Sequence, residues 1–238
     1  MTGKRGLIIA IDGVAGSGKS TTAKLVANRL GYMHVDTGAM YRAVALKLLR
    51  RGAELTDTDR LEELLATTTV SQRGVNSEAR VLLDGEDVTE AIRTPEISLW
   101  VGPVSENPLV REHLVRWQRE IGREGGVVLE GRDIGTVVFP DADLKVYLIA
   151  DLKTRAKRRR KEMLARGIDQ SLAEVEAALA ARDGRDSARE HSPLRRAPDA
   201  VELDTTDLTV GDQVDRVVEL ARKCGTNGTR PKSHAGGV

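Results

Sequence analysis

The sequence predicts an α/β fold built on a central parallel sheet, and three kinds of observation support this. Residues 7–11 form an apolar run, and a glycine-rich turn separates them from residues 21–30, whose apolar positions recur at helical spacing. A strand-like segment follows at 32–35, so the chain opens as strand, turn, helix and parallel strand. Apolar runs at 127–129 and 144–149 have the composition of further buried strands. At 238 residues we expect a single domain.

The turn after the first strand matches the pattern glycine, any four residues, glycine, lysine, serine or threonine. Glycines let backbone N–H groups approach a phosphate chain, and the following helix presents the positive end of its dipole. Lys19 can reach the outer phosphates, and the Ser20 hydroxyl is placed to bind Mg²⁺. A chance match is the alternative, but the flanking strand and helix are the context that the motif requires. We therefore predict the three-layer P-loop NTPase fold, with a nucleoside triphosphate bound by Gly13, Val14, Ala15, Gly16, Ser17, Gly18, Lys19, Ser20 and Thr21.

The segment at 36–42 follows the second predicted strand. It supplies a carboxylate, a hydroxyl and a guanidinium at Asp36, Thr37 and Arg42. The carboxyl ends of parallel strands lie at one edge of a sheet, so these groups should lie beside the phosphate loop. Arg42 could also be a solvated charge on a helix face, but its expected position favours ligand binding.

The middle of the chain changes pattern several times. Strand-like segments at 70–73 and 80–83, with polar turns at 74–78 and 84–87, predict a small antiparallel insertion. Gly102-Pro103 should end the helical stretch before it. The predicted helices of this part are 43–51, 57–65, 89–93, 95–101 and 109–123.

A second charged cluster follows the apolar run at 127–129. It consists of Glu130, Gly131, Arg132 and Asp133, and glycines beside charges suggest that a backbone lies close to a ligand. Adjacent residues are poorly placed to form an ion pair, which favours a ligand site over a structural Arg132–Asp133 contact. Arg111 is different, because near the start of its helix its simplest interpretation is a surface charge.

The C-terminal third is strongly charged. The predicted helix 154–166 is basic and could be a solvated face, a nucleic-acid patch or a mobile lid over the phosphates. A helix at 172–181 leads into alternating Arg and Asp at 182–189, which could be a solvent-exposed ladder of weak ion pairs. A strand at 200–204 and a helix at 210–223 follow. The polar tail from residue 225 onward should be disordered.

Composition limits the possible partners. A net charge of +1 and only 3% aromatic residues disfavour nucleic-acid binding. The single cysteine, Cys224, excludes an internal disulfide and a cysteine-based metal site. The chain has neither a membrane-length apolar run nor the long apolar core of a signal peptide, so we expect a cytoplasmic protein.

The motifs narrow the chemistry to phosphoryl transfer between small molecules. The chain has no Asn/Thr-Lys-X-Asp motif for reading guanine, as a GTPase would have, and no apolar strand ending in Asp-Glu, as transport and motor ATPases have. Arginines on several separate segments suit two phosphorylated substrates held end to end. A small-molecule or nucleotide kinase is therefore predicted, with a lid that excludes water during transfer.

The chain resembles the bacterial cytidylate kinases, within the P-loop nucleoside monophosphate kinases, over nearly all of residues 7–223. The runs DTGAMYR and GRDIGTVVFP are far more diagnostic than the phosphate loop itself. The matching segments, in family order, are 13–20 (GVAGSGKS), 36–42 (DTGAMYR), 108–111 (PLVR), 131–140 (GRDIGTVVFP) and 182–186 (RDGRD).

This resemblance implies a kinase that moves the γ-phosphate of ATP, with Mg²⁺, to CMP or dCMP. It implies a core at 1–36, 108–151 and 199–224, an acceptor-nucleotide region at 37–107 and a lid at 152–190, followed by a disordered tail at 225–238. We expect a monomer that binds neither nucleic acid nor membrane. The implied catalytic residues are Lys19, Arg132, Arg158, Arg182 and Arg189, with Arg158 and Arg189 on the lid. The implied acceptor-binding residues are Asp36, Thr37, Arg42, Arg111, Arg132, Asp133, Arg182 and Asp186, and the implied metal-binding residue is Ser20.

Within this resemblance, Arg111 and Asp133 would read the cytosine ring, which reverses the surface interpretation of Arg111. The family often has a serine where this chain has Gly102, so the base contact would come from a neighbour such as Ser105, from water, or from neither. The alternatives are a kinase for UMP or dephospho-coenzyme A and, from a different class, a non-catalytic nucleotide- or RNA-binding module.

Overall fold

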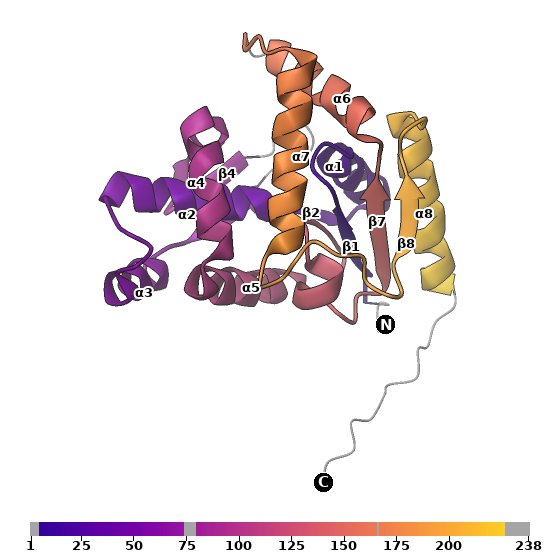
Figure 1. Ribbon diagram of the computed structural model, residues 1–238. Coiled ribbons are helices and arrows are strands. Elements are labelled where there is room, and N and C mark those ends of the chain that lie inside the picture. The colour runs from indigo at the N-terminus through magenta and orange to yellow at the C-terminus, as the bar shows by residue number, and fades with distance from the viewer. Residues whose placement is uncertain (1–4, 74–79, 166, 227–238) are drawn as a thin grey trace.

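The computed structural model describes residues 5–73, 80–165 and 167–226. Its centre is a five-stranded sheet in the order β2-β6-β1-β7-β8, and every neighbouring pair is parallel. The predicted parallel α/β fold is therefore confirmed (Figure 1). The strands are β1 (Ile8–Gly13), β2 (Met33–Asp36), β6 (Val127–Glu130), β7 (Leu144–Ile149) and β8 (Val201–Asp204).

The core lies on both faces of this sheet. Side chains alternate along β1, so Ile8 and Ala10 join one buried cluster while Ile9 and Ile11 join the other. Helices α1 (Lys19–Leu30) and α8 (Val210–Thr226) pack into the second cluster, and the two faces together give three layers. Across residues 5–73, 80–165 and 167–226, none of the helices has the length and apolarity needed to cross a bilayer. The first cluster is covered by α2 (Thr37–Arg51), α5 (Pro108–Gly122) and the short π-helix η3 (Ile134–Val138).

An antiparallel insertion sits beside α2, as predicted. Strands β3 (Val70–Arg73), β4 (Arg80–Leu83) and β5 (Glu86–Asp87) form a separate sheet in that order. The expected turn at 84–87 is shorter than predicted, because residues 86–87 already pair with β4. Asp84 and Gly85 make the tight turn, both with positive φ (50° and 88°). The turn expected at 74–78 lies outside the described residues.

Helix α4 (Pro95–Glu106) corrects one prediction, because it runs through Gly102-Pro103 without a break. Pro103 has no N–H to donate to the carbonyl group of Leu99, but Leu99 is 79% exposed, so water can take that bond. The break falls at Asn107 instead, whose side chain accepts hydrogen bonds from the backbone N–H groups of Leu109 and Val110 at the start of α5. The neighbouring short elements are α3 (Thr58–Ala66) and η2 (Ala91–Arg93).

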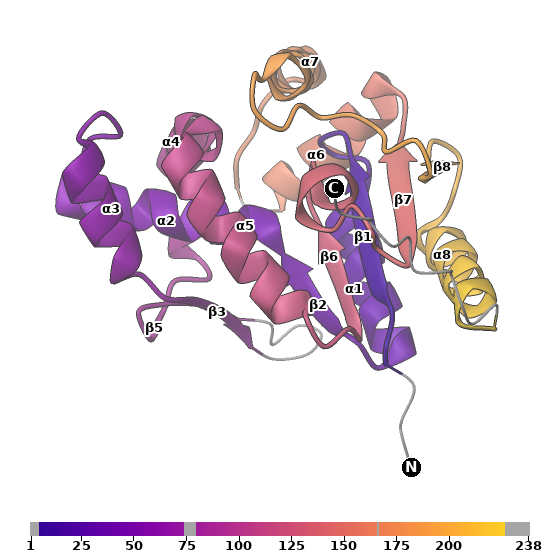
Figure 2. The ribbon, with the colours of Figure 1, turned by 90° about the horizontal axis from the view of Figure 1, so that it is seen from below.

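Helices α6 (Leu152–Leu164) and α7 (Leu172–Ala188) complete the fold. Helix α7 is longer than the predicted 172–181, because the Arg/Asp segment continues it by two turns. It crosses the front of the molecule between α4 and the sheet in Figure 1, and in Figure 2 it is seen nearly end-on, between α4 and β7. Arg166, at the end of the predicted basic helix, lies outside the described residues, as does the predicted tail from 227 onward. Residues 225 and 226 still belong to α8.

Candidate active site

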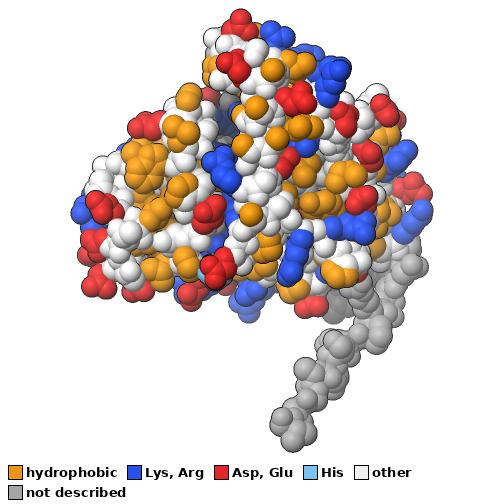
Figure 3. Space-filling model, in the orientation of Figure 1, with side chains coloured by type: hydrophobic (Ala, Val, Ile, Leu, Met, Phe, Trp, Pro, Cys, Tyr) orange, Lys and Arg blue, Asp and Glu red, His pale blue; other side chains and the backbone are white. Residues whose placement is uncertain are grey.

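The predicted site residues gather at the carboxyl edge of the five-stranded sheet. The phosphate loop follows β1, the 36–42 segment follows β2, and the Arg132–Asp133 segment follows β6. Strands β1, β6 and β2 are neighbours, so these segments lie side by side. In Figure 3 Lys and Arg side chains are visible along the seam between α4 and α7.

The phosphate loop has the backbone geometry that its glycines predict. Gly18 caps α1 with φ 94°, in the left-handed region. A Cβ atom on Gly13 would lie 2.1 Å from the carbonyl oxygen of Leu148, so only glycine fits there. Lys19 is buried, and its Nζ atom donates to the carbonyl oxygen of Val14 at 2.6 Å. Burial, together with the nearby Arg132 charge, lowers the pKa of Lys19 well below 10.5, so an anion in the loop would relieve an unfavourable charge.

Oxygen atoms beside the loop suit a magnesium ion. The Ser20 hydroxyl donates to the carboxylate of Glu130 at 2.6 Å, and His34 lies 3.1 Å from the other oxygen of that carboxylate. Mg²⁺ prefers oxygen ligands and binds through one or two protein groups together with substrate phosphates. Ser20 and Glu130 therefore fit such an ion. Over the described ranges, no group of three or more His, Cys, Asp or Glu side chains could hold a metal without the substrate.

The start of α2 brings together a carboxylate, a hydroxyl and a guanidinium. The Asp36 carboxylate caps the helix by accepting from the N–H of Ala39, and it also accepts from Arg42 at 3.0 Å. The Thr37 hydroxyl donates to the carbonyl oxygen of Glu130 at 2.6 Å, which ties α2 to β6. In the described part of the chain the buried Nε of Arg42 has no hydrogen-bond partner, so this guanidinium can still bind an anion.

The first residues of α5 bring Arg111 to Asp133. The two form a buried ion pair, and Arg111 also donates to the carbonyl oxygen of Ser105 at 3.2 Å. The Tyr41 ring lies under the guanidinium, with its centroid 5.9 Å away. Arg111 is therefore a buried residue of the site, and its interpretation as a surface charge was wrong.

Three arginines surround the carboxylate of Asp186 on α7. It accepts from Arg132 at 3.0 Å and Arg189 at 2.6 Å, and Arg182 lies 3.9 Å away. Asp186 is 3% exposed, so this segment is not the solvent-exposed ladder that was considered. Desolvation and the charge of Arg132 lower the pKa of Arg182 to about 10, although its side chain is 48% exposed and solvent screens much of that repulsion.

The predicted lid residue Arg158 lies apart from the cluster around Asp186, and Gly102 marks the position where the family often has a serine. Arg158 donates to the hydroxyl of Thr205 at 3.1 Å and to the backbone of the loop after β8. Thr205 in turn donates to the carbonyl oxygen of Ser17, so Arg158 lies on the outer side of the phosphate loop. Gly102 has open space around it, whereas the nearby Ser105 hydroxyl accepts from Arg189 at 3.0 Å.

Sequence reasoning missed three polar residues that shape the site. Glu130 belonged to the charged cluster after the apolar run at 127–129 but received no role of its own. An acid at the end of a buried strand, in a chain with a phosphate loop, was a usable signal for a residue near the metal. Asp183 accepts from the N–H of Ala15 at 3.2 Å, and Arg155 donates to the carbonyl oxygen of Ala15 at 3.0 Å. No local pattern indicates that these two residues would hold the tip of the phosphate loop, because they are distant in sequence.

Comparison with known proteins places the chain in one family. The family described as "Cytidylate kinase" matches residues 9–223. The cytidylate kinase of Geobacter sulfurreducens is 52% identical over 221 residues, covering 93% of this chain and 95% of that protein. The cytidylate kinase of Chlorobaculum tepidum is 50% identical, covering 92% of this chain and 94% of that protein. The cytidylate kinase of Geobacillus thermodenitrificans is 46% identical, covering 92% and 98%. This chain belongs to the cytidylate kinase family.

Proposed function

We propose that this chain transfers the γ-phosphoryl group of ATP to CMP or dCMP, giving ADP and CDP or dCDP. The observation that carries the proposal is the approach of two anion-binding groups at one sheet edge. Lys19 of the phosphate loop is close enough to Arg132 for the two charges to repel, and Arg132 belongs to the cluster around Asp186. A pair of phosphorylated substrates would bring negative charge into both groups.

The chemistry that these residues supply is positioning and charge neutralisation. An oxygen of the acceptor phosphate is already anionic, so no general base is required to activate it. Lys19 and the loop N–H groups hold the ATP phosphates, while Thr37, Arg42 and Arg132 hold the acceptor phosphate. Arg182 and Arg189 neutralise charge that builds up between the two substrates. Mg²⁺, held by Ser20 with Glu130 behind it, would neutralise the outer phosphates of ATP.

The acceptor base would be read by Arg111 and Asp133. Their ion pair is buried, so a base that fits both groups keeps their hydrogen bonds satisfied, and one that does not leaves a buried polar group unpaired. Asp186 would contact the ribose. The Ser105 hydroxyl, on the turn of α4 after Gly102, is the neighbour available to take the place of the family's serine.

We also propose the division into core, acceptor region and lid given above, with α6 and α7 as the lid. Arg158 and Arg189 would then act from the lid. The bonds from Asp183 and Arg155 to Ala15 support this division, because they link α6 and α7 to the phosphate loop without being part of the sheet. A monomeric, cytoplasmic enzyme without nucleic-acid or membrane partners remains our expectation, and sedimentation at working concentration would test the monomer.

The test is a coupled ADP-release assay with Mg-ATP and CMP, dCMP, UMP or AMP in parallel, with acceptor-free reactions to subtract ATP hydrolysis. We expect fast turnover with CMP and dCMP and little with the others. Comparable turnover with UMP would keep the kinase but overturn cytosine reading by Arg111 and Asp133. No turnover with any acceptor would overturn the proposed activity.

A further inference from the structure

Among the described residues, the side chain of Gln72 on β3 links the antiparallel insertion to the edge of the main sheet. Its Oε1 accepts from the backbone N–H of Asp36 at 2.9 Å, and its Nε2 donates to the backbone carbonyl of the same residue at 2.6 Å. In the described part of the chain, strand β2 is at the edge of the five-stranded sheet and pairs only with β6. The outward-facing backbone groups of Asp36 therefore have no strand partner among the described residues, and the Gln72 amide supplies both hydrogen bonds.

Asp36 is the residue through which the sheet passes into α2. Its carboxylate caps the helix and pairs with Arg42, and Thr37 follows it directly. Rotation of the Asp36 peptide would move the Asp36 carboxylate, and with it Arg42 and Thr37. The position of this peptide therefore affects where the Thr37 hydroxyl and the Arg42 guanidinium lie.

The insertion holds the far end of α2 as well. Lys47, whose side chain is 8% exposed, lies 2.7 Å from a carboxylate oxygen of Asp84 in the β4–β5 turn. Arg50 forms two hydrogen bonds with Glu86 of β5, at 2.7 and 2.9 Å. The antiparallel sheet thus contacts both ends of α2. Of these described contacts, only that of Gln72 lies beside Thr37 and Arg42. In Figure 2 β3 lies on the side of the molecule that carries α2 to α5.

We propose that Gln72 is a positioning residue for the acceptor phosphate, and that the insertion sets the acceptor site through it. The proposal rests on the assignment of Thr37 and Arg42 to the acceptor phosphate. Gln72 itself does not touch the reacting atoms. It fixes the Asp36 peptide. Its loss should weaken acceptor binding and leave ATP binding unchanged, because the hydrogen bonds of its side chain to described residues go to Asp36 and not to the phosphate loop.

The test uses the variant Gln72→Met, which keeps the length of the side chain and removes both polar atoms. Ser71→Ala, the neighbouring exposed residue on the other face of β3, is the matched control. Two lost hydrogen bonds should raise KM for CMP about tenfold, with KM for ATP within about twofold of wild type and kcat changed less than KM. Ser71→Ala should resemble wild type in every measurement.

A second measurement does not depend on activity. Amide hydrogen exchange in a peptide covering residues 33–42 should become faster in Gln72→Met, while a peptide covering 13–21 should be unchanged. Faster exchange at 33–42 in an enzyme that does not phosphorylate CMP would overturn the proposed substrate but keep the positioning of Asp36. Unchanged exchange at 33–42, or equal rises in KM for both substrates with a lowered Tm, would overturn the positioning proposal.

Discussion

Single buried charges in this site are held by partners from distant parts of the chain. Asp186 forms an ion pair with Arg132 from the loop after β6, and Asp133 forms one with Arg111 from α5. Removing one partner of such a pair leaves an uncompensated buried charge, which typically costs 3–5 kcal/mol. The arginines are therefore arranged before substrate arrives, and substitutions at these positions should be judged on both activity and stability.

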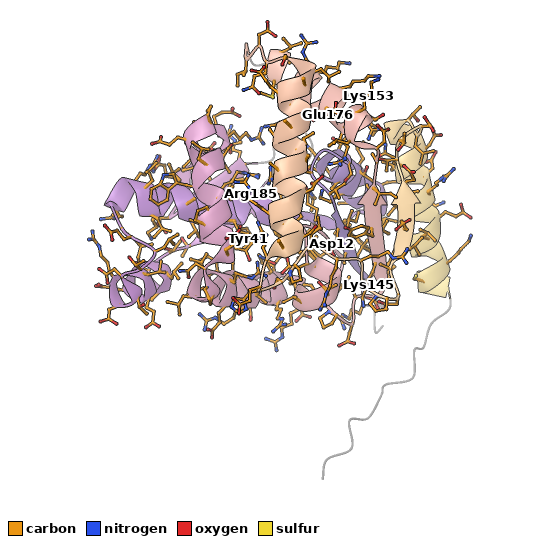
Figure 4. All side chains as sticks on the ribbon, in the orientation of Figure 1. Asp12, Tyr41, Lys145, Lys153, Glu176 and Arg185 are labelled. Carbon is orange, nitrogen blue, oxygen red and sulfur yellow. The ribbon has the colours of Figure 1, made fainter. Side chains whose placement is uncertain are left out.

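The first prediction concerns Lys19→Ala. Removing one preorganised charge from the transferring phosphates should lower kcat by about 10²–10³-fold. The fold should survive, because burial lowers the pKa of Lys19 and disfavours its charge before ATP binds, so losing that charge should cost the folded state little. A steady-state assay together with thermal unfolding tests both points. Lys153→Ala, on the exposed side of α6 (Figure 4), is the control and should leave both values near wild type. Activity of Lys19→Ala near that of wild type would contradict the site assignment.

The second prediction concerns Glu130→Gln, which keeps the shape of the side chain and removes its charge. The Mg²⁺ concentration for half-maximal activity should rise about tenfold, as for other residues behind a metal ligand. Saturating Mg²⁺ should restore most of the turnover. A titration of activity against free Mg²⁺ measures the shift, with Glu62→Gln on the exposed surface of α3 as control. If the Mg²⁺ dependence of Glu130→Gln matches that of the control, the metal site does not extend to Glu130.

At the scale of residues, the chemical roles of single side chains could be predicted from the sequence better than their contacts. The glycines and Lys19 of the phosphate loop were predictable because their chemistry is fixed by local spacing. Gln72 was not, because nothing at 70–73 reveals which backbone its amide will meet. The position of Arg158, against the Thr205 loop, depends on how α6 leaves β7, and a basic run does not contain that information.

At the scale of elements, the strands of the main sheet followed the apolar runs closely, whereas α2, α4 and α7 are five to seven residues longer than predicted. Helix α7 runs on through the Arg/Asp segment because Asp186 is buried there and pairs with Arg132 and Arg189. Helix α4 runs on through Gly102-Pro103 because its exposed side can lose one hydrogen bond to water. Both differences arise from tertiary surroundings, which override local propensity.

The third prediction follows from the proline in α4. Pro103 is exposed, so Pro103→Ala removes little packing and returns an N–H to the helix. The free energy of unfolding should rise by roughly 2 kcal/mol, the interior cost of proline less the entropy that it removes from the unfolded chain. Pro108→Ala is the matched control, because Pro108 occupies the first turn of α5, where proline is well tolerated. Urea unfolding of the two variants tests the difference, and equal changes would contradict the account of α4.

At the scale of the whole molecule, α7 joins parts of the chain that the sheet keeps separate. Its middle holds the phosphate loop through Asp183 and Ala15, and its end contacts α4 through Arg189 and Ser105. Figure 4 shows Arg185 on the same helix, and Asp12 and Tyr41 on either side of its lower part. A movement of α7 would therefore shift the phosphate loop and the acceptor region together, as a lid over two substrates requires.

The pH dependence of unfolding should reflect the buried carboxyl group of Asp12. Asp12 accepts from the N–H groups of Ile134 and Gly135 at 2.9 and 2.7 Å, which links β1 to η3. Burial nevertheless raises the pKa of Asp12 from 3.8 to about 6. Between these two values the native state keeps a proton that the unfolded chain has released. The free energy of unfolding should therefore fall as pH rises from about 4 to 6, and be flat with respect to Asp12 above that range.

The fourth prediction is that this decrease amounts to about 3 kcal/mol and is absent from Asp12→Asn, which cannot ionise. Asp12→Asn loses one of the two backbone hydrogen bonds, so it should be less stable than wild type at pH 4, where wild-type Asp12 is protonated in the folded chain. Its disadvantage should then shrink toward pH 6, because only wild type loses stability over that range. Carboxyl groups with lowered pKa values, such as Asp36 and Asp186, change stability only below about pH 4 and in the opposite direction. Urea unfolding at half-unit steps from pH 4 to 7 measures the difference between the two proteins. A difference that stays constant across this range would mean that Asp12 ionises normally in the folded chain and that its two backbone hydrogen bonds outweigh its burial.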